Sequence, residues 1–315
     1  MRSGKDFLRI LLVTLFLLVL PIGLIAQNLE LGVAWEGKSG MAERILTGME
    51  RALNESAPQI KLDIRKELSD VSALEKVVSE FEQSKNGMVV LRSSGTKLLG
   101  GRDLTVPSFV GATNNPVQLG AATTLMQPIP NLSGVTYYIP AKTKLETFLQ
   151  VYPEMKNYLL LVEEGHPGSP IDADETAEAA PQLGLNGQIV FCKNLDDAVT
   201  AVNRSNQDVS IIIGSQAMLL DNAAQLVEAA GNRPVFSYSE RPVEVGALCG
   251  VVADDDKLGY MLGLMVIEVL VKGTPVETLG IQTDPQPKLY LNSKTIVRLG
   301  LQVPYSILSV ATIIE

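Results

Sequence analysis

Polar and aromatic side chains gather in this sequence where apolar, strand-like runs end. Hydroxyl groups and the free backbone N–H groups at the starts of helices suit a carboxylate or another anion. Acidic side chains such as Glu240 or Asp254 suit an ammonium group, and the rings of Trp35, Tyr138 and Tyr238 offer flat walls. This combination indicates a site that binds a small polar molecule.

In an open α/β sheet, ligands bind outside the carboxyl ends of the strands. The loops after the predicted strands therefore give the candidate residues, and two crossings between the halves of the chain add Tyr138 and Asp254. In the first half the candidates are Trp35, Glu36, Ser94, Gly95, Thr96, Asn114 and Asn115, beside the polar Lys38, Ser93 and Thr113. In the second half they are Gly168, Ser169, Ser215, Gln216, Tyr238, Ser239 and Glu240, beside Glu164, His166 and Arg241.

Several candidates have a plainer interpretation that the sequence leaves open. Trp35 also fits a packed core aromatic, and Ser94 fits a helix cap. The pair Asn114-Asn115 precedes a proline and fits a turn. Asp254 begins an acidic run that fits the N-cap of the following helix.

The residue types that catalysis needs are sparse. His166 is the only histidine, and no G-x-S-x-G nucleophile motif occurs. One histidine and two distant cysteines cannot form a typical metal site. The sequence also lacks a phosphate-binding G-x-x-x-x-G-K-[ST] loop and a dinucleotide fingerprint. We therefore expect no enzyme, no metal and no cofactor.

Strand-like and helix-like segments alternate through almost the whole chain. Strands are predicted at 29–35, 61–68, 88–91, 105–110, 157–162, 188–192, 209–213, 234–236 and 287–292. Helices are predicted at 40–54, after Asp70, and at 172–182, 196–203, 216–230 and 256–272. Such alternation implies right-handed crossovers and parallel sheets covered by helices on both faces. The predicted fold class is α/β, with two doubly wound parallel-sheet lobes.

One sequence pattern, called here the repeated phrase, occurs twice. PSFVGATNNPVQLGA at 107–121 and PVFSYSERPVEVGA at 234–247 share Pro, Phe two residues later, a polar run, Pro-Val and Gly-Ala. An apolar strand and a loop with Gly and Ser precede each copy. We infer two similarly built lobes, each presenting an equivalent loop to one cleft between them.

The order of segments predicts the domain boundaries. Lobe one spans 27–137, lobe two spans 138–248, the chain returns to lobe one at 249–278, and 279–315 forms a tail in lobe two and the hinge. Three crossings at one edge make a three-segment hinge.

The N-terminus resembles a secretory signal peptide, predicted at 1–26. A basic start precedes the apolar run 10–20, and Ala26 is small enough to precede a cleavage point. Leu24 is larger than usual for its position, and an uncleaved membrane anchor is the alternative. The expected location is the periplasm.

Charge and cysteine content narrow the class further. Removing three basic residues and one acidic residue with the signal peptide takes the formal charge from −9 to −11. Such acidity argues against nucleic acid as a partner. Cys192 and Cys249 both sit in apolar runs, which favours two separate buried thiols over a disulfide.

From about Leu31 to the end, the chain resembles the exported substrate-binding proteins of ABC transporters, in their tryptophan- or tyrosine-binding branch. The resemblance rests on FVGATNNPVQLG, the SGVT crossover, KLETFLQVYPEMKNYLLLVEEG, PVFSYSERPVEVGALCGVVADDDKLGYMLGLM and LNSKTIVRLGLQVP. It implies a periplasmic-binding-protein fold of the first type, with two lobes, three crossovers and no catalysis. It also implies a permease in the inner membrane as partner, and we expect a monomer.

The resemblance carries the candidate residues over, Tyr138 excepted. This sequence departs from the family pattern at three places. Ser215-Gln216 replaces a common Asp-Asn pair, Asp255 replaces a common Tyr, and the first loop, WEGKSGM, is unlike the usual one. An amino acid, possibly aromatic, is the leading ligand. A sensory protein that presents its closed form to a membrane receptor is the alternative.

Overall fold

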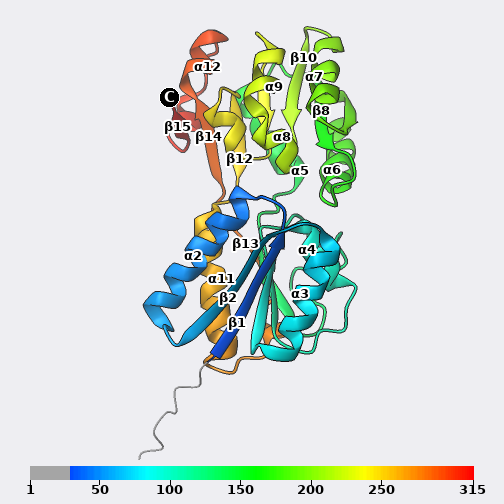
Figure 1. Cartoon of the computed structure of the whole chain (residues 1–315). Coiled ribbons are helices and arrows are strands. Elements are labelled where there is room, and N and C mark those ends of the chain that lie inside the picture. Colours follow the sequence, from blue (N-terminus) through cyan, green and yellow to red (C-terminus); the bar gives the residue numbers. More distant parts are fainter. Residues whose placement is uncertain (1–28) are drawn as a thin grey trace, which may run out of the picture.

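The computed structural model describes residues 29–315, so the signal peptide predicted at 1–26 lies outside the described residues. Two α/β lobes lie one above the other, and three chain segments pass between them (Figure 1). No helix in residues 29–315 combines the length and apolar character needed to span a bilayer.

Lobe one is built on a six-stranded parallel sheet in the order β13-β7-β4-β3-β1-β2. The strands of this sheet are β1 (Leu29–Glu36), β2 (Ile60–Leu68), β3 (Gly87–Leu91), β4 (Ser108–Gly111), β7 (Leu132–Thr136) and β13 (Ile281–Thr283). The helices of the lobe are α2 (Gly40–Ser56), α3 (Val71–Ser84), α4 (Arg92–Gly100), α11 (Asp255–Leu270) and the 3-10 helix η1 (Val276–Thr278). A small hairpin joins β5 (Ala122–Thr124) to β6 (Gln127–Pro128).

The sheet of lobe one separates two hydrophobic cores. Val33 and Val89 pack with α2 and α11 on one face, whereas Ala34 and Val90 pack with α3 and α4 on the other. Burial on both faces requires apolar residues at every position of a strand. This requirement explains why the sequence shows continuous apolar runs here instead of alternation.

Lobe two is built on a seven-stranded sheet in the order β15-β14-β12-β11-β10-β8-β9. The strands of this sheet are β8 (Asn157–Glu163), β9 (Asn186–Cys192), β10 (Val209–Ile213), β11 (Val235–Ser237), β12 (Cys249–Val252), β14 (Lys288–Asn292) and β15 (Thr312–Ile314). The helices of the lobe are α5 (Ala141–Val151), α6 (Ser169–Gln182), α7 (Leu195–Arg204), α8 (Ala217–Asp221), α9 (Ala223–Ala230), α10 (Arg241–Glu244), α12 (Ser293–Arg298) and α13 (Tyr305–Leu308). The helix predicted at 216–230 is therefore two helices, interrupted at Asn222.

The α/β prediction with two doubly wound lobes is confirmed, apart from the direction of two strands, β14 and β15, at one edge of the lobe-two sheet. β14 runs antiparallel to β12, while the other pairs in this sheet are parallel. The chain reaches β14 from lobe one and so arrives at the end of the sheet that faces the cleft. From there β14 can only run away from lobe one, against the direction of β12.

The three crossings lie at 137–140, 253–254 and 284–287, between elements of different sheets. Two predicted boundaries therefore shift. Residues 249–252, predicted to return to lobe one, form β12 of lobe two, and residues 281–283, predicted for the tail in lobe two, form β13 of lobe one. An apolar run in a sequence predicts a strand but does not say which sheet it joins.

Hydrogen bonds and ion pairs tie the second crossing to the third. The backbone N–H of Asp254 donates to the Asp284 carboxylate at 2.8 Å, and Lys257 pairs with the same carboxylate at 2.7 Å. Lys288 pairs with Asp254 from the start of β14. Asp254 also caps α11 by accepting from the N–H of Lys257, as the plainer interpretation predicted.

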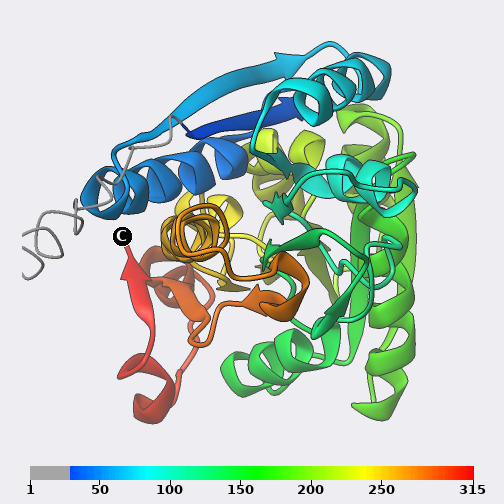
Figure 2. The ribbon, with the colours of Figure 1, turned by 90° about the horizontal axis from the view of Figure 1, so that it is seen from below.

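Helices α2 and α11 pack side by side, which both views of the ribbon show (Figures 1 and 2). The contact is close because glycines stand where the helices meet. A Cβ atom at Gly259 would lie 2.2 Å from the carbonyl oxygen of Ile45, and one at Gly48 would lie 2.2 Å from that of Asp256. This packing holds the first turns of both helices at the cleft.

The repeated phrase forms the same structure in both lobes. β4 lies between β3 and β7, and β11 takes the matching place between β10 and β12. In both copies the Ala N–H donates to the Pro carbonyl, at 2.9 Å from Ala121 to Pro116 and 2.8 Å from Ala247 to Pro242. The glycine before each alanine has positive φ, 78° in the first copy and 113° in the second, which favours glycine there.

The two cysteines are free and buried, as predicted. Cys192 ends β9 and packs in one core of lobe two, whereas Cys249 starts β12 and packs in the other core. The sheet separates the two thiols.

Candidate functional site

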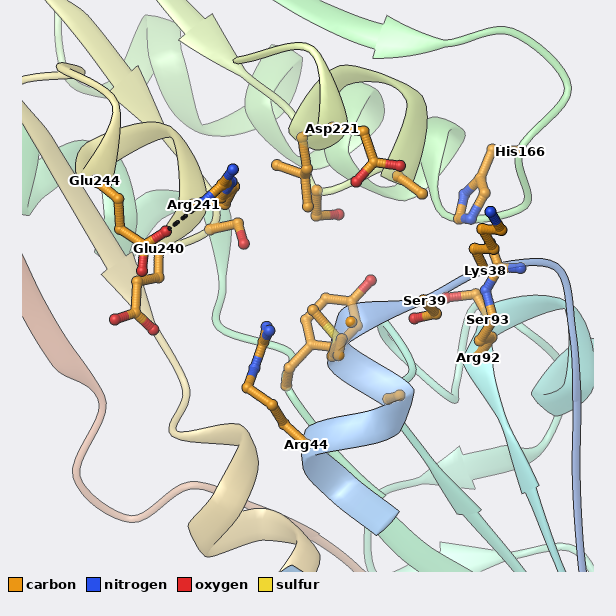
Figure 3. A pocket seen from close by; sticks show the side chains of 18 residues that line it. Lys38, Ser39, Arg44, Arg92, Ser93, His166, Asp221, Glu240, Arg241 and Glu244 are labelled. Carbon is orange, nitrogen blue, oxygen red and sulfur yellow. Dashed lines mark hydrogen bonds and ion pairs between the residues drawn. The ribbon is translucent and has the colours of Figure 1, made fainter. Parts of the chain in front are cut away.

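A cavity of ≈ 690 Å³ lies between the lobes, where strands of both sheets end (Figure 3). This position agrees with the rule that ligands bind at the carboxyl ends of parallel strands. Lobe one contributes Lys38, Ser39, Gly40, Met41, Arg44, Arg92, Ser93, Ala112 and, from the first crossing, Tyr137. Lobe two contributes His166, Ser215, Ala217, Leu220, Asp221, Ser239, Glu240, Arg241 and Glu244.

The lobe-one side is organised around the start of α2. The hydroxyl of Ser39 caps this helix by accepting from the N–H of Ala42 at 3.2 Å. Gly37, with φ of 61°, turns the chain from β1 into the cap. The free N–H groups of the first helical turn and the side chain of Lys38 thus lie at the cavity, an arrangement that suits an anion.

Arg92 is held at the end of β3 by Glu36. Its guanidinium pairs with the Glu36 carboxylate at 3.1 Å and also donates to the Glu36 carbonyl. The hydroxyl of Ser94 donates to the same carboxylate. Glu36 is therefore engaged within lobe one, and Arg92 is the group of this set that lines the cavity.

The lobe-two side carries acidic groups. Glu240 precedes the short helix α10, whose Arg241 and Glu244 pair with each other at 3.1 Å. Asp221 ends α8, and Ser215 follows β10. The two sides of the cavity thus differ in charge, since Lys38, Arg44 and Arg92 come from lobe one.

A second, smaller recess continues the cavity toward the second crossing, lined by Tyr137, Tyr238, Glu240 and Asp255 among others. Arg44 donates to Oδ2 of Asp255 from Nε at 3.0 Å and from Nη2 at 2.8 Å. Burial raises the pKa of Asp255 to about 6, Arg44 opposes this rise, and Glu240 adds to it. The carboxylate of Glu240 therefore contributes a negative field in this recess.

Tyr238 lies at the floor of the recess with a buried cation above its ring. Its hydroxyl is 2.6 Å from that of Thr176, and the Lys144 amine lies 4.0 Å from the ring centroid. Burial raises the pKa of Tyr238 and lowers that of Lys144, whereas the nearby carboxylates of Asp172 and Glu175 oppose the fall at Lys144. Tyr238 thus lines the recess, and Lys144 contacts its ring.

The lobes touch each other through Asp172, a buried residue of α6. The side chain of Asn114 donates across the interface to its Oδ1 at 3.0 Å. Its Oδ2 accepts from the N–H of Ser215 at 3.1 Å, the hydroxyl of Ser215 at 2.7 Å and the amide of Gln216 at 2.7 Å. Beside this group, Glu175 accepts from Asn115 at 3.2 Å. Asn114 thus joins lobe one to a carboxylate that Ser215 and Gln216 hold within lobe two.

His166 stands at the same junction and lines the cavity. Its Nδ1 accepts the N–H of Gly168 at 3.0 Å, which fixes the neutral ring. Burial and, to a smaller extent, the neighbouring charge of Arg92 together lower the pKa of His166 to about 4, against the opposing effect of the Asp172 carboxylate.

The structure brings a minority of the predicted residues to the cavity. Ser215, Ser239 and Glu240 line it, and Tyr238 lines the recess. Lys38, Ser93, His166 and Arg241 also line it, from the predicted loops.

The other predicted residues lie elsewhere. Trp35 is completely buried in the core against α2, and Gly95 and Thr96 are buried in α4, where a Cβ at Gly95 would meet Val90 at 2.6 Å. Ser169 donates to the Glu163 carbonyl at the start of α6. The remaining positions outside both lining sets are Glu36, Ser94, Asn114, Asn115, Tyr138, Gly168, Gln216 and Asp254.

Five charged or aromatic lining residues were missed by the sequence analysis: Arg44, Arg92, Tyr137, Asp221 and Glu244. Arg44 and Asp221 lie inside helices, so a rule that searches loops after strands does not find them. Arg92 did carry a signal, because it directly follows the buried strand β3.

Comparison with known proteins agrees with this architecture. The sequence model of the family described as ABC transporter substrate binding protein matches residues 36–314, so the chain belongs to that family. The resemblance seen in the sequence is thereby confirmed.

Particular proteins are similar to this chain in sequence or in fold. A tyrosine-binding protein of Clostridioides difficile is 24% identical over 256 residues, covering 77% of this chain and 71% of the relative. The structure of an ABC domain from Streptococcus pneumonia in complex with L-Trp has a TM-score of 0.80 at 21% identity, covering 91% of this chain and all of that one. A conserved domain protein from Vibrio cholerae has a TM-score of 0.81 at 17% identity, covering 92% of this chain and all of that one.

Proposed function

We propose that this protein is the extracytoplasmic solute-binding component of an ABC importer and captures an amino acid between its two lobes. The observation that carries the proposal is the cavity between the lobes, with cations on one side and carboxylates on the other. An amino acid is a zwitterion, and it finds a partner for its carboxylate on lobe one and for its ammonium on lobe two. Family membership and the tyrosine and tryptophan named for two relatives support this class of ligand.

Closure of the lobes on the ligand follows from where the charges lie. A ligand shifts a conformational equilibrium only through contacts that differ between the two states. Here opposite charges stand on opposite lobes, so a zwitterion gains most when the lobes approach. The closed form is then the one that the permease of the inner membrane receives.

The test is thermal unfolding of the protein after unfolding and refolding have removed any bound ligand. Amino acids, small carboxylates, nucleosides and sugars are added in turn. A ligand at a hundred times its Kd stabilises by ~2.7 kcal/mol. For a protein of this size, that corresponds to a rise in Tm of about 2–4 °C. A rise with amino acids alone supports the proposal, and a rise only with another class overturns it.

The Lys38→Gln variant ties the shift to the cavity. Removing this cation should lower the Tm rise with amino acids, because it faces the ligand carboxylate. Lys61→Gln is the matched control, since Lys61 is an exposed lysine on the edge strand β2 of the same lobe. Equal shifts in both variants would place the amino acid elsewhere.

A further inference from the structure

The two ends of the cavity carry opposite charge. In Figure 3, Lys38 and Arg92 lie together on one side with Ser39, while Glu240 and Glu244 lie on the opposite side and Asp221 lies above. The cavity thus has a cationic end beside the start of α2 and an acidic end beside α10.

Ion pairs within the protein satisfy most of these groups. Arg44 pairs with Asp255, Arg92 with Glu36, and Arg241 with Glu244. Among residues 29–315, three charged side chains that line the cavity take part in no ion pair: the cation Lys38 and the carboxylates Asp221 and Glu240. Glu240 lies in the field of Lys288, but that lysine is itself paired with Asp254.

An amino acid with an uncharged side chain does not match this set. Its carboxylate and ammonium sit on the same carbon atom, so the two groups occupy neighbouring positions in the cavity. Its carboxylate would pair with Lys38 and its ammonium would pair with one acidic side chain. The second acidic side chain would then have no cationic partner. A carboxylate that loses its water without gaining a partner is costly, so such a ligand is disfavoured.

Apolar side chains also line the cavity, and one aromatic ring is among them. Met41, Ala112, Ala217 and Leu220 line the cavity together with Tyr137. Trp35, the largest flat side chain predicted for the site, lies in the core instead. Apolar walls that end in carboxylates suit a methylene chain that ends in a cation, as in lysine or arginine side chains.

Resting on the proposed function, we infer that the ligand is an extended amino acid with a second cationic group, an ammonium or guanidinium, at the far end of its side chain. Its carboxylate lies at the Lys38 end, its α-ammonium pairs with Asp221 of α8, and its side-chain cation pairs with Glu240 at the acidic end. The ligand class is therefore that of the basic amino acids.

The test compares L-lysine and L-arginine with L-norleucine, which has nearly the shape of lysine without the amine, and with L-tryptophan. Calorimetric titration of the refolded full chain gives the Kd of each. We expect lysine or arginine to bind at least about tenfold more tightly than norleucine, as close charge pairs do at other interfaces. The variant Glu240→Gln should weaken binding of the basic ligand by about tenfold and change norleucine binding by less than about threefold. The variant Asp221→Asn should weaken binding of both ligands, because both carry the α-ammonium.

Glu178→Gln is the matched control. Glu178 is an exposed acid of α6 in the same lobe, outside the cavity lining, and its replacement removes the same charge from the lobe. This variant should bind every ligand as the parent protein does.

The outcomes separate this inference from the proposed function. Norleucine or tryptophan binding as tightly as lysine would overturn the basic-ligand inference and leave amino-acid capture standing. Equal losses in Glu178→Gln and Glu240→Gln would also overturn it, because the effect would then come from net charge. No binding of any amino acid would overturn both proposals.

Discussion

The two copies of the repeated phrase have the same backbone conformation but different roles. Both form a buried strand with Phe109 or Phe236, and both close with the same hydrogen bond from Ala to Pro. The polar run of the second copy lines the cavity through Ser239 and Glu240. The polar run of the first copy is buried, and its Asn114 reaches across to Asp172 of lobe two.

This difference teaches that an equivalent place in two lobes does not give an equivalent role. The hypothesis that each copy presents its loop to one cleft is supported for the second copy, whereas the first supplies only Ala112 to the lining. An amide can both donate and accept in a buried interface, which suits Asn114 to joining the lobes. Glu240 is only partly buried and lines the cavity, so its carboxylate can contact a ligand.

The largest expected effect tests what the copies share. Phe109→Ala and Phe236→Ala should each lower the free energy of unfolding by about 3–5 kcal/mol, because each leaves a cavity in a core. Phe236 also stacks on Phe148 at 4.7 Å, so its loss should exceed that of Phe109 by about 1 kcal/mol. Denaturant unfolding followed by circular dichroism measures both.

Tyr305→Ala, at 83% exposure, is the control. A loss below about 1 kcal/mol in either Phe variant would contradict equal burial of the copies.

A smaller effect tests what separates the copies. Asn114→Ala should destabilise by about 1.5–3 kcal/mol, because it removes a hydrogen bond to a buried carboxylate. Among the described residues, Asn114 is the donor to Oδ1 of Asp172, since the other three donors all reach Oδ2.

Ser239→Ala provides the matched comparison in the second copy. It should change stability by less than about 0.5 kcal/mol, since it leaves no buried group unpaired, and should instead weaken ligand binding. Unfolding and ligand titration of both variants decide the matter. If Asn114→Ala unfolds at the same denaturant concentration as the parent, the bridging role is wrong.

The smallest expected effect is a change of stability with pH, caused by His166, which lies near Asn114 where the lobes meet. A Cβ at Gly168 would lie 3.5 Å from the Asn114 amide, next to the ring of His166. The pKa of His166 is about 4 in the folded protein and about 6.5 in the unfolded chain. Between these two pH values only the unfolded chain binds a proton at this histidine. The contribution of His166 to stability should therefore fall by about 1–2 kcal/mol as the pH drops from 7 to 5. Asp255, whose pKa is raised to about 6, takes up a proton in the folded protein over the same range and offsets part of this fall.

The variant His166→Gln assigns this pH dependence to the single histidine. Denaturant unfolding at pH 7 and pH 5 should show a smaller loss in the variant, because glutamine does not titrate. An unchanged slope would mean that carboxylates alone set the stability in this range.

Much of the fold could be predicted because it depends on local patterns. Runs such as IIIG and LLLV must be buried on both faces, so they predict a parallel sheet covered by helices. The position of the site at strand ends followed from the same pattern, and it led to Ser215, Ser239 and Glu240. The repeat was visible because its Pro, Phe and Gly are needed by backbone and core.

The composition of the site needed the tertiary structure. Asp172 reads as an acidic residue in the first turn of a helix, which is common, yet it collects four hydrogen bonds from both lobes. Arg44 lies at the cavity because glycines let α2 approach α11 closely. There it pairs with Asp255, which lies 211 residues further along the chain.

The sequence by itself determined two α/β lobes, their repeated strand and the polar loops at the strand ends, because burial and turn chemistry act over a few neighbouring residues. The tertiary structure alone decided which of those polar groups meet and which remain for a ligand. Glu36 and Arg92 neutralise each other, whereas Lys38 and Glu240 face the cavity from opposite lobes. Charges combine through distance in space, and the chain brings together groups that lie far apart along it.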